Sequence, residues 1–166
     1  MKKICIKIHL ILTLFLSQIL AQVNIGQWDA YTCPLEIRSV ALKGDSIISA
    51  TGGGLLIKSQ NQFTTLTTID DIHRVDLFSV AMDNYDNIWI GGNSPNGFIQ
   101  LYNFDQGSIE VFDYGLSEIT HFYFDNEIAY VCFIDGQDVG FMKFVYSNGK
   151  WSYRDIYRNF PVELEK

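Results

Sequence analysis

Hydrophobic and polar residues alternate with a period of two in short runs along the chain, a pattern that indicates half-buried β-strands. Runs of this kind cover residues 39–42, 78–82 and 121–124. Each is followed by a turn rich in Gly, Asp or Asn and then by a more apolar run, such as Ile128–Phe133. Strands of this length separated by turn residues predict an all-β domain built from hairpins.

The same order of strands and turns occurs three times, in segments that begin at Ile37, Leu77 and Ile119. Ile47, Ile88 and Ile128 are 41 and 40 residues apart. Each unit reads as four short strands, and a period near forty is typical of one four-stranded propeller blade. The sequence therefore predicts a partial β-propeller of about three antiparallel blades within residues 37–161, with blades at about 37–68, 77–113 and 119–158.

The segment "DNYDNIWIGG" at residues 83–92 shows how one unit is built. Asn and Asp tolerate positive φ and bond their own backbone, so "DNYDN" predicts the hairpin between the first and second strands. "IWIGG" then forms the second strand and its exit. A calcium loop is the alternative, but the acids lack the alternating spacing of an EF-hand. We therefore expect no metal site and no cofactor.

Residues 1–21 have the order of a secretory signal peptide: a basic start, an apolar run and a small residue, Ala21, before the cleavage point. The apolar run, Ile8 to Leu16, is shorter than the roughly 20 residues of a membrane-spanning helix. We expect an exported protein, located in the periplasm or at the cell surface. Residues 22–36 are expected to hold a strand that would complete a last blade, and residues 159–166 a truncated tail.

The net charge of the chain limits the partners that it can bind. Without residues 1–21 the chain has nine basic and nineteen acidic residues, a net charge of −10. Such a surface repels phosphate backbones, so no nucleic-acid partner is expected.

Two cysteines, Cys33 and Cys132, remain in the chain once residues 1–21 are set aside. They could pair in an oxidising compartment, but separate buried thiols are the favoured interpretation.

Three blades are fewer than the four to eight that close a propeller ring. An open stack leaves unpaired strand edges, which favour pairing with another chain. Two interpretations follow. The chain is a fragment of a longer propeller, which is the favoured one, or it closes by self-association with a second copy.

Catalytic motifs are absent: the sequence contains neither Gly-x-Ser-x-Gly nor His-Glu-x-x-His. The alternation places His121 opposite in phase to Phe122 and Phe124, facing a neighbouring blade. Loops on a rigid scaffold commonly carry function. The loops between blades and between second and third strands would present a ring of short polar groups able to hold a sugar or a peptide: Asp70, Asp71, His73, Arg74, Asn93, Asn96, Asp135, Gln137 and Asp138.

"DNYDNIWIGG" followed by "GFIQLYNFDQG" resembles the repeat of two-component regulator propellers, whose usual form is Asp-x-x-Gly-Asn-Ile/Leu-Trp-Ile-Gly-Thr. Asp86 stands where that repeat has glycine, and the third unit has "YVCFIDGQ" instead of Trp-Ile-Gly-Thr. The start of the mature chain, with Trp28 and Tyr31, also resembles PorZ-like secreted propellers of Bacteroidetes-type bacteria. The first resemblance implies carbohydrate sensing through a partner kinase, and the second a role beside type IX secretion.

The sequence as a whole favours an exported, non-enzymatic propeller module that recognises a protein or a carbohydrate. It would serve a sensor ectodomain or a secretion-associated surface complex. The alternative is a fragment of a propeller polysaccharide hydrolase or lyase whose catalytic residues lie outside this chain.

Overall fold

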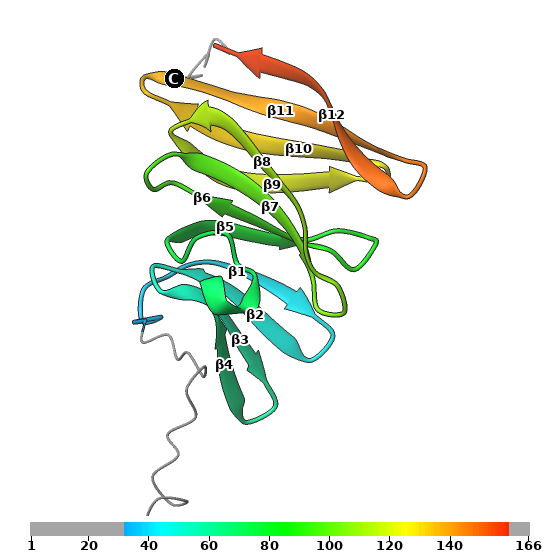
Figure 1. The fold of residues 1–166 in the computed structure, drawn as a ribbon. Coiled ribbons are helices and arrows are strands. Elements are labelled where there is room, and N and C mark those ends of the chain that lie inside the picture. The colour runs from blue at the N-terminus through cyan, green and yellow to red at the C-terminus, as the bar shows by residue number, and fades with distance from the viewer. Residues whose placement is uncertain (1–31, 160–166) are drawn as a thin grey trace, which may run out of the picture.

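The computed structural model describes residues 32–159, and these form three four-stranded antiparallel sheets stacked face to face (Figure 1). The predicted all-β, three-bladed architecture is confirmed. The helical content of the described residues is one short 3-10 turn, η1 (Thr68–Asp70), between the first and second sheets. The predicted signal peptide, Trp28, Tyr31 and residues 160–166 lie outside the described residues, and residues 32–36 form a turn that leads into the first sheet.

Each sheet is a meander in which strands follow one another in chain order. Blade 1 consists of β1 (Ile37–Lys43), β2 (Ser46–Thr51), β3 (Gly54–Ser59) and β4 (Gln62–Leu66). Blade 2 consists of β5 (Leu77–Met82), β6 (Ile88–Gly92), β7 (Gly97–Asn103) and β8 (Gly107–Leu116). Blade 3 consists of β9 (Glu118–Asp125), β10 (Ile128–Asp135), β11 (Asp138–Ser147) and β12 (Lys150–Arg158).

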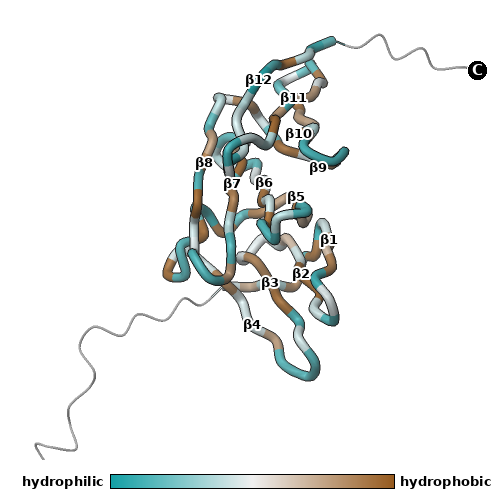
Figure 2. The backbone as a smooth tube through the Cα atoms, turned by 90° about the vertical axis from the view of Figure 1, so that its right-hand side faces the viewer, coloured by the Kyte–Doolittle hydropathy of each residue, from teal (hydrophilic) through white to brown (hydrophobic). Residues whose placement is uncertain are grey.

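The hairpin turns have the backbone that their residues predict. Asn148 and Gly149 both have positive φ, 54° and 79°, as a type I′ turn requires between β11 and β12. Asp86 has φ 64° in the turn between β5 and β6, which confirms that "DNYDN" forms a hairpin. Hydrophilic residues gather at many of these turns and hydrophobic ones within the strands (Figure 2).

Two hydrophobic cores lie between the blades. The first joins Ile48 and Leu55 of blade 1 to Ile90 and Phe98 of blade 2, all fully buried. The second surrounds Trp89 of blade 2 with blade 3 residues, among them Val131, Phe133, Met142, Phe144 and Trp151. Stability therefore depends on burial between neighbouring sheets, because a single sheet of this size cannot bury its own apolar face.

Hydrogen bonds also join the first strands of successive blades. The hydroxyl of Ser79 donates to the carbonyl oxygen of Ile119 at 2.8 Å. The hydroxyl of Ser39, at the equivalent position of blade 1, donates to the carbonyl of Val80 at 3.3 Å and accepts from the same residue's N–H at 3.2 Å. These bonds fix the position of one blade relative to the next.

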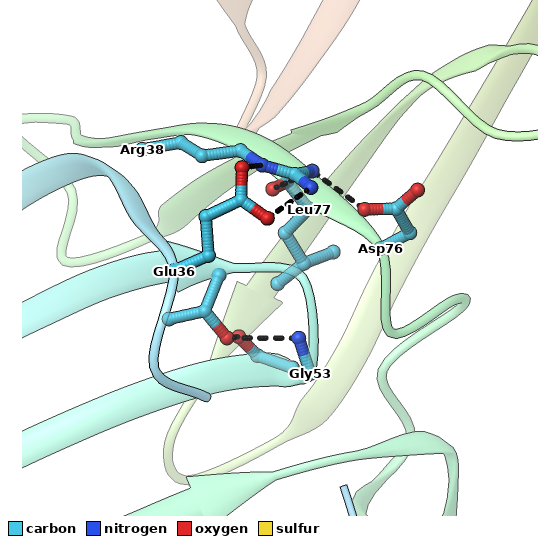
Figure 3. A network of polar contacts seen from close by, with 7 residues as sticks. Glu36, Arg38, Gly53, Asp76 and Leu77 are labelled. Carbon is cyan, nitrogen blue, oxygen red and sulfur yellow. Dashed lines mark hydrogen bonds and ion pairs between the residues drawn. The ribbon is translucent and has the colours of Figure 1, made fainter. Parts of the chain in front are cut away.

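Arg38 adds a charged link between blades 1 and 2 (Figure 3). Its guanidinium lies between the carboxylates of Glu36 and Asp76 and donates to the carbonyl oxygen of Leu77 at 3.1 Å. The hydrogen bond from Arg38, reinforced by its charge, lowers the pKa of Glu36. The start of β1 is thereby fastened to the start of β5.

Candidate functional site

Antiparallel meanders place alternate connections at opposite ends of the stack. One end carries the loops between blades and between second and third strands, where the sequence predicts binding residues. The other end carries the turns between first and second strands and between third and fourth strands. We refer to the predicted end as the loop end and to the opposite one as the hairpin end.

At the loop end, several of the predicted residues have structural partners. The Asp70 carboxylate accepts from the backbone N–H of Thr67 at 3.0 Å and completes a capping box around η1. Arg74 donates to the carbonyl of Asn96 at 3.1 Å and lies 5.4 Å from the ring centre of Phe98. Asp135 pairs with Arg158 at 2.6 Å. These contacts stabilise the loops. Because the side chains are engaged in them, they are less free to bind a ligand.

The predicted residues separate into two groups. Arg74 and Asn96 meet beside blade 2, whereas Asp135 and Asp138 flank the β10–β11 turn of blade 3. Within residues 32–159 no hydrogen bond or ion pair joins one group to the other. The continuous polar ring expected from the sequence stays a prediction, and the structure brings together only part of its members.

The buried residue that organises this end is Gln100, which sequence reasoning missed. Its side chain is fully buried and accepts from the His73 N–H at 2.9 Å. It also donates to the Asp71 carbonyl at 2.7 Å and to the Ser108 hydroxyl at 2.8 Å. A glutamine inside the apolar run "GFIQLY" was the available signal, because a buried amide must find partners.

His73 lies edge-on against Phe98, with ring centres 5.0 Å apart. Burial, followed by the neighbouring Arg74 charge, lowers the pKa of His73 from 6.5, and Asp113 opposes the shift. A lowered pKa keeps the imidazole neutral near pH 7. The ring therefore serves as an aromatic surface here rather than as a cation.

The hairpin end contains a cavity of about 640 Å³ between blades 2 and 3. This volume falls within the range of roughly 300–1,000 Å³ that is usual for small-ligand pockets. Its lining combines carboxylates and amides with an aromatic ring and two aliphatic side chains. The residues are Asn84, Tyr85, Asp125, Asn126, Glu127, Ile128 and Val145.

Two turns position the polar groups of this cavity. Asn84 and Tyr85 belong to the β5–β6 hairpin, and Asn126 and Glu127 are the two residues between β9 and β10. Asn126 has φ 53°, a left-handed conformation that Asn accepts more readily than most residues. The side chains of Asp125, Asn126 and Glu127 are exposed, so they can contact a ligand without first losing a protein partner deep in the core.

Tyr85 is the aromatic wall of the cavity. Its ring stacks on Tyr146 of blade 3, with centres 3.6 Å apart and planes 16° apart. Burial raises the pKa of Tyr85, so its phenol stays protonated and can donate a hydrogen bond. The same ring lines a second cavity of about 220 Å³ that also includes Trp151 and Glu110. Tyr85 therefore lies where a ligand on this end would meet both blades.

Asp83 holds the base of this end together. The carboxylate is buried and accepts from the N–H groups of Tyr85 and Asn87 at 2.8 and 2.9 Å. It also accepts from the indoles of Trp89 at 3.1 Å and Trp151 at 2.7 Å. Its oxygens are thus occupied by protein donors. Across residues 32–159, no group of three or more His, Cys, Asp or Glu side chains is arranged to hold a metal ion.

The two cysteines of the described region are free. Cys33 is exposed at the start of blade 1, and Cys132 lies half-buried in β10, where burial raises the pKa of its thiol. A thiol with a raised pKa is a poor nucleophile.

Between residues 32 and 159, no helix has the length and hydrophobicity needed to cross a bilayer.

Comparison with known proteins supports the architecture. No family model and no curated protein matches the chain. Among solved structures, the extracellular domain of a hybrid two component system from B. thetaiotaomicron aligns over 79% of this chain, with 14% identity and a TM-score of 0.56. A second structure, described as the extracellular domain of a one component system from the same organism, aligns over 76% with 17% identity and a TM-score of 0.51.

The chain spans 18% of the length of each of these two structures. At such identities the similarity establishes the fold. The protein is therefore a partial, propeller-like all-β domain, and its fold is similar to that of these two extracellular domains.

Proposed function

We propose that this chain is an exported recognition module that binds a neutral carbohydrate at the hairpin end, without catalysing its conversion. The single observation that carries the proposal is the cavity of about 640 Å³ that brings Tyr85 together with Asp125, Asn126 and Glu127. A protein ligand with hydroxyl or basic side chains on its surface is the second candidate for the same cavity.

The chemistry of the lining supports a sugar. Carboxylate oxygens accept hydrogen bonds from hydroxyl groups, while amides such as Asn84 and Asn126 can both donate and accept. A ring such as Tyr85 offers an apolar surface beside these groups. The two acids, Asp125 and Glu127, would repel an anionic ligand, and the net charge of the chain acts in the same direction. A neutral glycan therefore suits the cavity better than an acidic one.

Export and biological setting belong to the same proposal. The order of residues in 1–21 and the extracellular origin of the two similar structures support secretion to the periplasm or cell surface. A place in a sensor ectodomain is supported by the regulator-propeller resemblance of "DNYDNIWIGG". The alternative place beside type IX secretion rests on Trp28 and Tyr31, which lie outside the described residues.

The test is a binding screen of the full chain against immobilised neutral and acidic oligosaccharides, followed by calorimetry with the best neutral probe. We expect binding to neutral glycans, and a loss of at least about tenfold in Glu127→Gln, since one lost charged hydrogen bond is worth about 1.5–3 kcal/mol. The matched control is Asp45→Asn. Asp45 occupies the equivalent two-residue turn of blade 1, which does not line the cavity.

Three outcomes would contradict the proposal. Binding that both variants weaken equally would place the ligand elsewhere. A preference for acidic glycans would disagree with the charge of the cavity. Shortening of the probe during incubation, detected by chromatography, would show that the chain is an enzyme.

A further inference from the structure

The second cavity of the hairpin end lies between β7 and β8 of blade 2 and β11 and β12 of blade 3. Its volume is about 220 Å³. Pockets that bind a small ligand on their own usually measure roughly 300–1,000 Å³. The second cavity is smaller than this range, so it is suited to one part of a ligand that also occupies a neighbouring site.

The neighbouring site is the first cavity, which measures about 640 Å³. Tyr85 lines both cavities. On β11, Val145 lines the first cavity and Tyr146 the second, because successive side chains of a strand point to opposite faces of the sheet. The two cavities therefore meet at the side chain of Tyr85, and a chain-like ligand can continue from one to the other across its ring.

Three aromatic rings form a fixed wall in the second cavity. Tyr85 stacks on Tyr146, with ring centres 3.6 Å apart. Trp151 lies edge-on to Tyr85 at 6.0 Å and lies 5.3 Å from Tyr146. The hydrogen bond from the Trp151 indole to Asp83 holds this ring in place. Because the wall is already ordered, little conformational entropy is lost there when a ligand binds.

The rim of the second cavity carries polar side chains that are still available to a ligand. Gln106, Glu110 and Lys150 line the cavity and are exposed. Within residues 32–159 their side chains make no hydrogen bond or ion pair. At the loop end, by contrast, Arg74 and Asp135 are already paired with other residues. The free polar groups therefore lie at the hairpin end.

These groups match the hydroxyls of a neutral sugar. A carboxylate such as Glu110 accepts hydrogen bonds, an ammonium such as Lys150 donates them, and the amide of Gln106 does both. A hydroxyl also donates and accepts, so it can bond to each of the three. The opposite charges of Glu110 and Lys150 offset each other, whereas the first cavity contains the two acids Asp125 and Glu127. A neutral ligand avoids repulsion in both cavities.

We propose that the second cavity is a second sugar subsite, and that the hairpin end therefore binds a neutral oligosaccharide of at least two units. One unit lies in the first cavity beside Glu127. The chain then crosses Tyr85, and a further unit meets Gln106, Glu110 and Lys150. This inference rests on the proposed carbohydrate function, to which it adds the second subsite and a minimum length for the ligand.

The experiment measures affinity as a function of ligand length. Unbranched glucose, mannose and galactose oligomers of one to six units are titrated into the full chain, by calorimetry for the longer probes and by NMR for the weaker short ones. The affinity of the recognised series should rise at least about tenfold once the probe reaches the second cavity, which corresponds to about 1.4 kcal/mol. Further units should add little.

Variants separate the contributions of the two cavities. Glu110→Gln removes an acceptor, and Gln106→Trp fills the second cavity. Each should remove most of the gain in affinity with length. Glu127→Gln, in the first cavity, should weaken short and long probes alike. Asp105→Asn is the matched control, because it removes the same charge as Glu110→Gln from an exposed residue of the β7–β8 turn that does not line the cavity. Circular dichroism verifies the fold of each variant.

NMR also places the sugar units directly. Monosaccharides should shift the backbone N–H signals of Asn126 and Glu127, which belong to the first cavity. Longer probes should in addition shift those of Gly149 and Lys150, which line the second cavity.

The outcomes distinguish failure of the second subsite from failure of the proposed function. Affinity that does not depend on length would overturn the second subsite alone. So would a gain with length that survives in both second-cavity variants, or longer probes that leave Gly149 and Lys150 unshifted. If no probe binds, or if Glu127→Gln leaves binding unchanged, the proposed function itself is wrong and the inference falls with it.

Discussion

The indole N–H of Trp151 in blade 3 donates to Asp83 of blade 2 at 2.7 Å, across the interface between the two blades. Trp89 donates to the same carboxylate oxygen at 3.1 Å. One acid therefore fixes a tryptophan from each blade, with the two indole rings 5.2 Å apart and nearly perpendicular. The residue that directly follows the first strand of blade 2 thereby positions the last strand of blade 3.

Replacing Asp83 with Asn should destabilise the protein by about 2–4 kcal/mol, because an amide cannot accept all the hydrogen bonds that the carboxylate accepts and its own NH2 would face buried donors. Urea unfolding monitored by tryptophan fluorescence measures this loss directly. Asp86→Asn is the control, since Asp86 lies in the same turn but is exposed and has a left-handed backbone that suits Asn. Equal effects of the two changes would contradict the role given to Asp83.

Ser79→Ala should cost about 1–2 kcal/mol of unfolding free energy, because it leaves the buried Ile119 carbonyl without its donor. Ser39→Ala should cost less, since the Ser39 bonds are longer, at 3.2–3.3 Å, and only partly buried. Parallel urea unfolding curves provide the comparison. A larger loss of unfolding free energy in Ser39→Ala than in Ser79→Ala would contradict the role given to these hydroxyls in positioning neighbouring blades.

Gly91→Ala should destabilise the contact between blades 2 and 3. An added Cβ would overlap the Ser79 hydroxyl and the Ile119 side chain. Overpacking of this kind typically costs about 1–3 kcal/mol. Gly52→Ala is the matched change, because its nearest neighbour is the flexible end of Arg38 at 3.3 Å. Thermal unfolding should separate the two variants, and similar midpoints would mean that the blades can move apart without loss.

His73 should titrate below pH 6.5, its ordinary value, because burial and Arg74 disfavour the charged imidazole. The unfolded chain then binds a proton more readily than the folded one, so the contribution of His73 to stability is complete above about pH 6.5 and falls as the pH drops below it. NMR titration gives the pKa directly. In Arg74→Gln the pKa should rise towards 6.5, and an unchanged value would exclude the charge as a cause.

The periodic features of the fold could be predicted from sequence because they are local. Alternation placed the strands, and residues such as Asn148 and Gly149 marked the turns. Repeats near forty residues then identified the blades. These signals depend on neighbouring residues only, and the structure confirms the all-β, three-bladed fold class that they predict.

Partners distant in sequence could not be predicted in the same way. Asp83 and Trp151 are separated by 68 residues, and no local pattern links them. The side chain of Gln100 reaches a loop 27 residues earlier. Equally, Asn126 and Glu127 fit the requirements of a turn so well that nothing in the local sequence indicates a cavity. Turn residues become a site only when a second blade brings Tyr85 beside them.

The stacking of blades also determines where local unfolding begins. Each blade contacts mainly the next, so the stack behaves nearly as a one-dimensional array in which stability is shared between neighbours. Within residues 32–159, blade 2 packs against a neighbouring blade on both faces, whereas blades 1 and 3 each pack against a neighbouring blade on one. Amide hydrogen exchange should therefore be slowest in β6 and β7 and faster towards either end. Local unfolding would begin at the outer blades and leave Trp89 protected until last.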